Sequence, residues 1–465
     1  MTSLRVLPFA AAAALSLGGC GNGSNGSPDL AMNEGPDMAT PTLCTGDDCM
    51  TMSSIKHVVI VIQENHTFDN YFATYCTATS GSNPTCNTGP ACCEAGPATE
   101  ASGAAPVVLD DNDNSGTFND RNHTHNCEVA EIDSGAMDHF VTGANMVDGI
   151  ACSTGENFAY SPDTLVQPYH DLAAAGALAD RYFQPYAGQS SANDMYFARA
   201  QFVFADNMFA SNGIGGICTQ AGASTTKMDF NDPTIANLLV QHGVAWSWYA
   251  GGYKAMKDAN PTSASQCPTA PAECTFGVKS YPCDYDPTDV PFTYYPSTRD
   301  KDGEMKDFDA DFAADLAAGK LPPVAFVKGI GYKTEHPGAN ITISAGVTFV
   351  KGVLDAIAAS PEASSTLVLV TWDEGGGFYD HVAPPPTSTV DNQPYGTRVP
   401  FIAVGPFVKT NYVSHVTMEH SSIVKFIEWN WLGGATGQLN GRDAHVNNIG
   451  DFLDPAKTGT AVPNN

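Results

Sequence analysis

Positive charge is the scarcest feature of this sequence. Its 465 residues include 21 lysines and arginines against 50 aspartates and glutamates, which gives a formal net charge of -29 at pH 7. This imbalance argues against nucleic acid as a partner and against electrostatic docking on anionic lipid, because no basic patch is available for either. An anionic substrate would need a metal ion or a local positive charge to overcome the field of the protein.

A hydrophobic run long enough to cross a membrane is missing as well. The apolar residues 6–17 follow Arg5 and have the length of the hydrophobic region of a signal peptide. They end in Leu17-Gly18-Gly19-Cys20, which resembles a bacterial lipobox, so cleavage would leave Cys20 as a lipidated first residue. The alternative is an ordinary secretory signal with a chance cysteine. We therefore predict an exported bacterial lipoprotein, at the outer membrane, at the cell surface or outside the cell, that contacts the membrane only through Cys20.

Cysteine is absent after residue 283, and no paired C-x-x-C spacing of the kind that binds zinc occurs. The chain has 13 cysteines, so that an even set of 12 remains without Cys20. An even set in an exported chain predicts disulfides rather than a zinc-thiolate site. The spacing leaves their pairing open.

The order of apolar segments predicts the fold class. Buried-type strands are expected at 55–62, 244–249, 324–328, 366–372 and 399–404, and helices at 163–182, 192–204, 233–239, 344–359 and 421–432. This alternation predicts an α/β fold with a mostly parallel sheet covered by helices. The cysteine- and proline-rich residues 76–126 and 251–300 are interpreted as loop insertions, residues 21–53 as a disordered tether, and residues 456–465 as a polar tail.

Two of the predicted strands end in the same kind of side chain. Asp373-Glu374 and three glycines follow residues 366–372, and Glu64-Asn65 follows the strand at 55–62. If the two strands are neighbours in a parallel sheet, four oxygen-bearing side chains meet at one edge, as a divalent cation such as Zn²⁺, Mg²⁺ or Ca²⁺ requires. Asp380-His381 brings a further carboxylate and an imidazole towards the same place. The alternative is a pair of strand ends capped by polar turns.

Residues 56–75 and 371–385 resemble the two end signatures of the bacterial phosphoesterase family, which contains acid phosphatases and non-haemolytic-type phospholipases C. Shorter blocks at 137–140, 335–337 and 396–406 are also similar, and the resemblance extends over about residues 55–435. That family belongs to the alkaline phosphatase superfamily. The resemblance implies an alkaline phosphatase-like three-layer α/β/α sandwich for residues 54–455, with a mostly parallel central sheet and Cys-rich loop insertions, preceded by a signal peptide at 1–20.

The resemblance also implies a nucleophilic hydroxyl held at a metal ion, at the start of a helix. The matching stretch Gly188-Gln189-Ser190-Ser191 places Ser190 at the nucleophile, so that Ser190 joins Glu64, Asn65, Asp373 and Glu374 as an expected metal ligand. A serine at a helix N-terminus is suited to phosphate. Gln189 replaces the proline of the family pattern, so Ser191 remains an alternative, as does a plain capping role for either serine.

Three histidines complete the expected site. His123 has Asp120 three residues before it, His336 lies in Glu-His-Pro, and His381 lies in Asp-His-Val. We expect them to bind phosphate oxygens or to protonate the leaving group, with structural roles as the alternative.

These residues predict a metal-dependent phosphoesterase that acts on a phosphorylated small molecule or a phospholipid. An acid phosphatase is the first hypothesis, because residues 68–75 and the serine nucleophile resemble that branch of the family. A phospholipase C is the alternative, although no C-terminal lipid-binding domain follows the last family block. An inactive metal-binding surface lipoprotein is the third hypothesis. The sequence does not indicate the oligomeric state.

Overall fold

The computed structural model describes residues 43–116, 119–218 and 226–465. The expected signal peptide, Cys20 and most of the expected tether lie outside these residues. At the centre of the described part is strand β1 (His57–Gln63), in which all seven residues are buried. Its run of Val58 to Ile62 is apolar and β-branched on both faces, which is the composition of a strand covered on two sides. β1 pairs in parallel with β7 (Val324–Lys328) on one side and with β8 (Thr366–Trp372) on the other.

The central sheet has eight strands within the described residues, in the order β10-β4-β9-β8-β1-β7-β5-β6. All neighbouring pairs are parallel except the two that involve β9, which is antiparallel to both β4 and β8. The outer strands are β4 (Ala177–Ala179), β5 (Trp246–Ala250), β6 (Met305–Asp307), β9 (Phe401–Val404) and β10 (Tyr412–Ser414). The mostly parallel sheet predicted from the sequence is confirmed.

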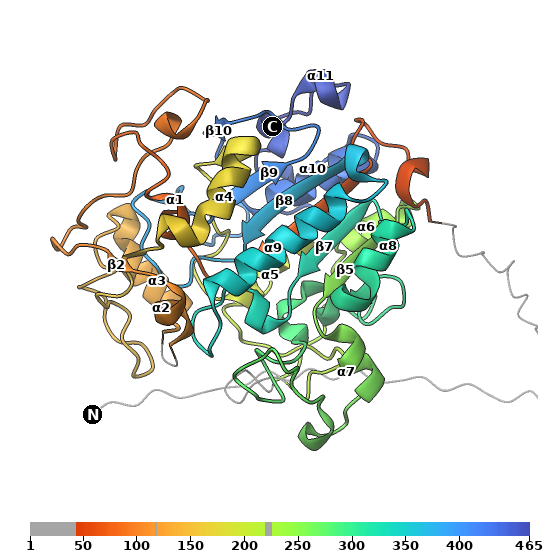
Figure 1. The fold of residues 1–465 in the computed structure, drawn as a ribbon, viewed down its shortest axis with the longest axis horizontal. Coiled ribbons are helices and arrows are strands. Elements are labelled where there is room, and N and C mark those ends of the chain that lie inside the picture. The colour runs from red at the N-terminus through yellow and green to blue at the C-terminus, as the bar shows by residue number, and fades with distance from the viewer. Residues whose placement is uncertain (1–42, 117–118, 219–225) are drawn as a thin grey trace, which may run out of the picture. The chain divides into compact units, whose positions relative to one another are not determined.

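Helices cover both faces of this sheet (Figure 1). One layer contains α4 (Asp163–Ala175), α8 (Ala313–Ala317) and α9 (Ile343–Ala358), and the other contains α5 (Ser190–Arg199), α6 (Ile235–Gln241) and α10 (His420–Trp431). The arrangement is therefore the predicted three-layer α/β/α sandwich. The shorter elements are α1 (Phe68–Phe72), α2 (Asp111–Ser115), α3 (His125–Ile132), α7 (Tyr253–Ala259), α11 (Pro455–Thr458) and a small parallel pair of β2 (Val107–Val108) and β3 (Ala159–Tyr160).

The segment predicted as one helix over 163–182 is wrong in its second half. Helix α4 ends at Ala175, and β4 begins two residues later. Gly176 makes this change of direction possible, because a Cβ there would lie 2.2 Å from the backbone oxygen of Ala403 in β9. The apolar periodicity that continues past Gly176 therefore belongs to a buried strand.

Both ends of the described chain are bound to the domain. In the part assigned to the tether, the Met52 amide donates to Asn430 O at 2.9 Å and the Ser53 hydroxyl donates to Asn430 Oδ1 at 2.7 Å. In the part assigned to the polar tail, the Asn464 carbonyl accepts from the Asn448 amide at 2.8 Å. Met52, Ser53 and Asn464 thus contact the domain through hydrogen bonds.

The predicted disulfides are confirmed. The pairs are Cys44–Cys49, Cys76–Cys93, Cys86–Cys92, Cys127–Cys152, Cys218–Cys267 and Cys274–Cys283. Disulfides of this number are typical of proteins that fold in an oxidising compartment outside the cytoplasm. Among the helices that the structure describes, none combines the length and apolar character needed to cross a bilayer.

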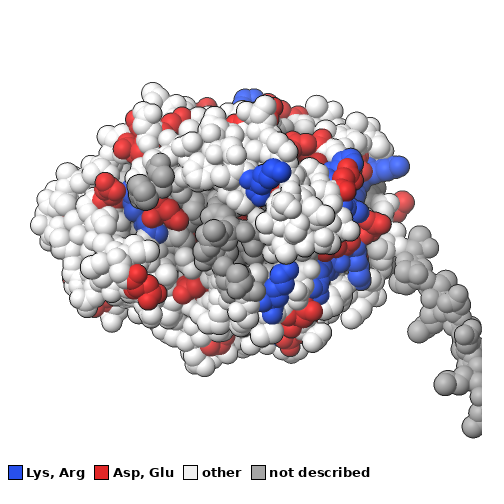
Figure 2. All heavy atoms as spheres, turned by 90° about the horizontal axis from the view of Figure 1, so that it is seen from below, with Lys and Arg blue, Asp and Glu red and all other residues white. Residues whose placement is uncertain are grey.

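The surface agrees with the charge of the sequence. Figure 2 shows one face, on which most of the lysine and arginine side chains lie in the right-hand half and are interspersed with aspartates and glutamates. The described part of this face therefore offers no broad basic patch for a polyanion.

Candidate active site

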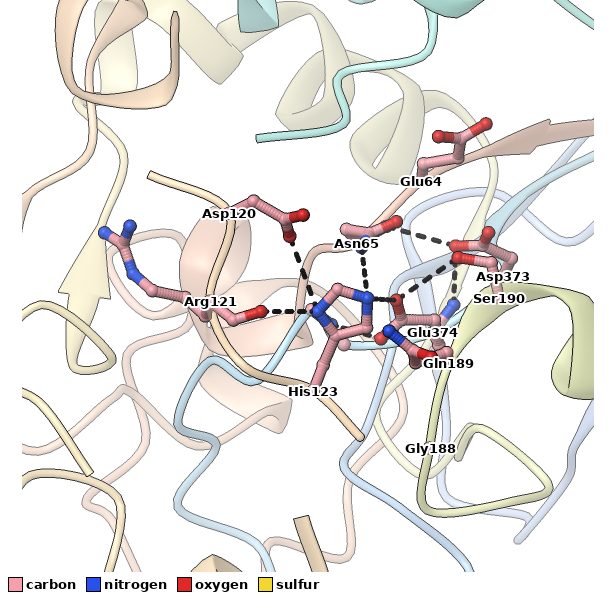
Figure 3. Close-up of polar contacts among 12 residues, drawn as sticks. Glu64, Asn65, Asp120, Arg121, His123, Gly188, Gln189, Ser190, Asp373 and Glu374 are labelled. Atoms are coloured by element: carbon pink, nitrogen blue, oxygen red, sulfur yellow. Dashed lines mark hydrogen bonds and ion pairs between the residues drawn. The ribbon is translucent and has the colours of Figure 1, made fainter. Parts of the chain in front are cut away.

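The ends of β8, β1 and β7 bring charged side chains to one edge of the sheet. Gln63 pairs with Trp372, so the segments that follow, Glu64-Asn65 and Asp373-Glu374, leave the sheet side by side. All four of these side chains are at most 2% exposed. The convergence expected from the sequence is present in the structure (Figure 3).

Local backbone contacts hold the two strand ends together. Asp373 Oδ1 accepts from the Asn65 amide at 3.1 Å and from the Glu374 amide at 2.7 Å. Asn65 has a left-handed backbone with φ of 60°, which turns the chain directly after the strand. Gly376 has φ of 66°, and a Cβ there would lie 2.4 Å from Asn65 O. A glycine is therefore needed for this close approach.

Ser190 is the first residue of α5 and lies beside this cluster. Its Oγ donates to Glu374 Oε1 at 3.4 Å. The neighbouring Ser191 Oγ donates instead to the carbonyl of Thr288 at 3.1 Å. Of the two candidate serines, the structure thus directs the hydroxyl of Ser190 towards the carboxylates.

His123 lies on the other side of Glu374. Its Nδ1 is 2.6 Å from the carbonyl of Arg121, which assigns the donating proton of a neutral ring to Nδ1. Its Nε2 is left facing the cluster, 3.5 Å from Glu374 Oε1 and 3.5 Å from Asn65 Nδ2. Asp120 Oδ1, also expected from the sequence, is 3.5 Å from Nδ1. Figure 3 shows these contacts joining His123 to Ser190 through Glu374.

His336 borders the same cluster. Its ring lies 6.5 Å from that of His123 and 5.5 Å from that of Tyr281, between ring centroids, with an edge-on orientation in both cases. His336 Nδ1 is 2.7 Å from the carbonyl of Pro337. The ring is therefore oriented by the backbone, as His123 is.

The prediction that His381 belongs to this site is not supported by its contacts. Its Nδ1 is 2.8 Å from Asp69 Oδ2, and its Nε2 is 3.2 Å from Glu94 Oε2. Asp69, Asp380 and His381 lie close enough together to share a cation. However, the Arg398 guanidinium already pairs with Asp69 at 3.0 Å and with Asp380 at 2.8 Å, so this group has its own positive charge. Within the described residues, the ion pairs of His381 are thus with this network and not with Ser190 or the carboxylates at the strand ends.

The side chains at the strand ends fit a divalent cation. Asn65 Oδ1 is buried and has no hydrogen-bond partner in the part of the chain that the structure describes, and Glu64 Oε1 and Asp373 Oδ2 have only the Lys328 ammonium near them, at 3.1 and 3.7 Å. Buried oxygens without donors are costly unless a cation or water satisfies them. Carboxylate and amide oxygens are the ligands of hard divalent ions. The donor set therefore suits a divalent metal ion.

Burial and mutual repulsion control ionisation in the cluster. Burial, together with neighbouring carboxylates, raises the pKa of Asp373 and of Glu374 well above their ordinary values. Burial likewise raises the pKa of Asp194 to about 7. Burial opposes the ionisation of Glu64 too. The charges of Lys328 and His336 and the hydrogen bond from Tyr281 outweigh this effect, so the pKa of Glu64 is lowered. A cation would favour the charged form of all four groups.

Three residues of the site were not singled out from the sequence. Lys328 ends β7 at the same edge of the sheet, so the rule that revealed Glu64 and Asp373 could have revealed it. Asp194 follows Ser190 by one helical turn and lies on the same side of α5. Tyr281 comes from the loop closed by Cys274–Cys283, and no local pattern indicated that its hydroxyl would donate to Glu64 Oε2 at 2.8 Å.

The contact of Tyr281 leads to a first prediction. Tyr281→Phe removes the donor that orients Glu64, so we expect about 10-fold weaker binding of a divalent cation, measured by calorimetric titration of the chelator-treated chain. Tyr285→Phe is the matched control. Tyr281 and Tyr285 line one small cavity, but the Tyr285 hydroxyl has no hydrogen-bond partner among the described residues. Equal affinities for both variants would contradict the positioning role.

A second prediction concerns Glu335, which precedes His336. Burial raises its pKa to about 7, although the Tyr71 and Tyr169 hydroxyls and the Trp372 indole donate to it. Because the pKa of Glu335 is higher in the folded chain than in the unfolded chain, the protonated carboxyl stabilises the fold. This stabilisation is complete below about pH 4.5 and is lost as the pH rises through 7. The free energy of unfolding should therefore fall, relative to Glu335→Gln, by roughly 3 kcal/mol between pH 4 and pH 9.

Denaturant titrations across this pH range measure the effect. Glu156→Gln is the control, because the Glu156 side chain is 64% exposed and should leave the pH dependence as it is. Parallel curves for the wild type and Glu335→Gln would show that Glu335 ionises alike in both states.

The fold and the site together define a class of protein. A mostly parallel α/β sheet with carboxylates, an amide and a serine hydroxyl at its carboxyl edge presents these groups where open α/β sheets bind their ligands. Comparison with known proteins specifies the class further: the model of the Phosphoesterase family matches residues 55–432. The chain belongs to this family, as its two end signatures predicted.

Individual relatives agree with this assignment. The chain is 33% identical over 143 residues to the non-hemolytic phospholipase C of Pseudomonas aeruginosa, covering 24% of this chain and 20% of the relative. It is 33% identical over 147 residues to non-specific phospholipase C6 of Arabidopsis thaliana, covering 26% and 28%. Phospholipase C A of Mycobacterium tuberculosis is 24% identical over 414 residues, covering 81% and 72%. The matches to the first two thus span less than a third of either relative.

Among solved structures, a Vibrio parahaemolyticus protein of the alkaline phosphatase superfamily aligns over 88% of this chain and 74% of that one. The identity is 11% and the TM-score is 0.36.

Proposed function

We propose that this chain is a metal-dependent phosphoric ester hydrolase in which Ser190 is the nucleophile. The observation that carries the proposal is the position of the Ser190 hydroxyl, at a helix start, where it donates to the buried Glu374 carboxylate at 3.4 Å near Asn65 Oδ1, which has no partner among the described residues. Glu64, Asn65, Asp373 and Glu374 would hold the cation together with Ser190. When bound, the cation would lower the pKa of the serine hydroxyl and neutralise charge on the phosphate.

The residues of the chain then have defined tasks. The deprotonated Ser190 Oγ attacks phosphorus, so that an Oγ–phosphorus bond forms while the bond from phosphorus to the leaving oxygen breaks. The leaving oxygen takes a proton from His123 or His336 in the imidazolium form, in which Nε2 carries a proton as well as the Nδ1 that faces a backbone carbonyl. Water then gives one proton back to that histidine and attacks phosphorus, so that the Oγ–phosphorus bond breaks, Ser190 Oγ is restored, and a phosphate monoester leaves, or inorganic phosphate when the substrate is a monoester. The backbone N–H groups at the start of α5 favour the negative charge of the phosphoryl group.

A phosphodiester is the substrate class that the charges favour. A diester has one negative charge, whereas a monoester has close to two at neutral pH. The acidic residues around Lys328 outnumber it, so the smaller negative charge is repelled less. The named relatives are phospholipases C. We therefore place phospholipase C activity first and acid phosphatase activity, which the resemblance of residues 68–75 favours, second.

Exposed apolar side chains near His123 also support a lipid substrate. Met146 is 64% exposed and Ile150 is 60% exposed. Their turn is attached to the site, because the carbonyls of Val147 and Ile150 accept from Asn122, the residue before His123. Apolar side chains beside a polar site are suited to the acyl end of a phospholipid.

The test is hydrolysis of phosphatidylcholine and of a chromogenic phosphomonoester by the full chain, with and without a chelator. We expect release of diacylglycerol that stops on chelation and returns when a divalent cation is added. Turnover of the monoester alone would assign an acid phosphatase. Folded protein that binds a cation and hydrolyses neither ester would indicate a metal-binding lipoprotein without this activity.

A further inference from the structure

Lys328 is the one cationic side chain that the described part of the chain places in contact with the carboxylates of this cluster. Its ammonium lies 3.1 Å from Glu64 Oε1, 3.4 Å from Asp194 Oδ2 and 3.7 Å from Asp373 Oδ2. The residue is 3% exposed. Three carboxylates from three separate elements, the end of β1, the end of β8 and α5, thus surround one buried cation.

The position of Lys328 follows from the sheet. In β7 its Cα pairs with that of Ile62, two residues before Glu64, so the lysine stands at the same edge as the carboxylates. Ile62 also pairs with Thr371 of β8, so Lys328 and Thr371 lie at the same level of the sheet on either side of β1. The β8 and β1 ends contribute oxygen ligands, whereas the β7 end contributes a fixed positive charge. The cluster is therefore divided into a side suited to a metal ion and a side already occupied by an ammonium.

Two of the oxygens face both sides. Glu64 Oε1 and Asp373 Oδ2 form ion pairs with Lys328 and have no other hydrogen-bond donor within the described residues, so each retains capacity for a metal ion. Asp194 Oδ2 is linked to Lys328 as well, at 3.4 Å. Positive charge on both sides stabilises the ionised form of buried carboxylates held this close together, because an unpaired buried charge is strongly unfavourable.

We propose that Lys328 takes the place of a second divalent cation, so that the site binds one metal ion per chain and the lysine neutralises the carboxylates on the β7 side. Lys328 thereby acts as a positioning residue that holds Glu64 and Asp373 for the single metal ion. This inference rests on the proposed function only in taking a cation at the strand ends as given.

The experiment is a count of bound cations. The chelator-treated full chain is titrated with Mn²⁺ alone and with Zn²⁺ alone, and bound metal is measured by calorimetry and by elemental analysis after dialysis. We expect one ion for the wild type and two for Lys328→Ala, in which Glu64, Asp194 and Asp373 lose their shared counter-charge. Lys333→Ala is the matched control: its side chain is 30% exposed and pairs with Asp309 outside the cluster, so the count should stay at one.

Two ions in the wild type, or one ion in Lys328→Ala, would overturn the inference. Should Lys328→Ala fold only when metal is present, the count is made on protein refolded with Mn²⁺ and is judged in the same way. Should it not fold at all, the double variant Lys328→Met, Asp194→Asn removes one charge of each sign and should fold with one ion, and failure to fold would also count against the inference. Because no substrate is used, a wild type that binds one ion but hydrolyses no phosphoester would refute the proposed activity alone.

Discussion

Ser190→Ala should lower phosphoester turnover by about 10⁴- to 10⁶-fold, the range expected when a catalytic nucleophile is removed. The neighbouring hydroxyl does not replace it, because Ser191 donates to the Thr288 carbonyl. The loss should appear in kcat, and the wild type quenched in acid during turnover should yield a phosphorylated peptide that contains Ser190. Steady-state kinetics and mass spectrometry of the quenched protein measure both effects.

Ser191→Ala is the matched control for this prediction. It removes a hydroxyl one residue away whose contact is with a backbone carbonyl, so turnover should be retained and stability should fall by about 1 kcal/mol. A phosphorylated peptide in Ser190→Ala, or loss of turnover in Ser191→Ala but not in Ser190→Ala, would move the nucleophile to the second serine.

Arg398→Met should destabilise the fold strongly. The guanidinium donates to Asp380 Oδ1 at 2.8 Å, to Asp69 Oδ1 at 3.0 Å and to the Asp180 carbonyl at 2.9 Å. It also stacks over the Phe68 ring at 4.3 Å. Removing it leaves two buried carboxylates facing each other, a change that costs about 3–5 kcal/mol. Denaturant unfolding of the full chain with intact disulfides measures this loss.

Arg299→Met provides the comparison. Arg299 pairs with Asp229 at 2.8 Å, but the Asp229 side chain is 41% exposed, so solvent screens the pair and the expected cost is at most about 1 kcal/mol. Equal losses for the two variants would contradict the buried network around His381. A loss of cation binding in folded Arg398→Met, without a loss of stability, would place this network in the metal site after all.

The strand ends could be predicted because they depend on local composition and one rule of topology. Residues 324–328 and 366–372 are continuous apolar runs bounded by polar residues, and the structure has strands with these same limits. Parallel neighbours end at one edge, so Glu64-Asn65 and Asp373-Glu374 were expected to meet. The segment after Gly176 was misjudged because apolar periodicity alone does not separate a short buried strand from the end of a helix.

The histidines could not be assigned in the same way. His123 reaches the cluster because its ring is held by the Arg121 carbonyl, and His381 does not because Asp69 and Glu94 bind both of its nitrogens. Both residues follow polar loops, and nothing in their sequence neighbours distinguishes the two outcomes. The direction of a side chain after a turn depends on contacts with distant segments.

Composition and periodicity were sufficient for the presence of disulfides, the α/β layers and the oxygen-rich strand ends, since each of these depends on residue types and on segments that are short in the chain. The different roles of individual residues in the site depend on the tertiary structure instead. Ser190 faces Glu374 while Ser191 does not, Lys328 neutralises the β7 side, and Tyr281 reaches Glu64 from a disulfide-closed loop. These contacts join residues that are remote in sequence, and their geometry exists only once the strands have paired and the loops have packed on them.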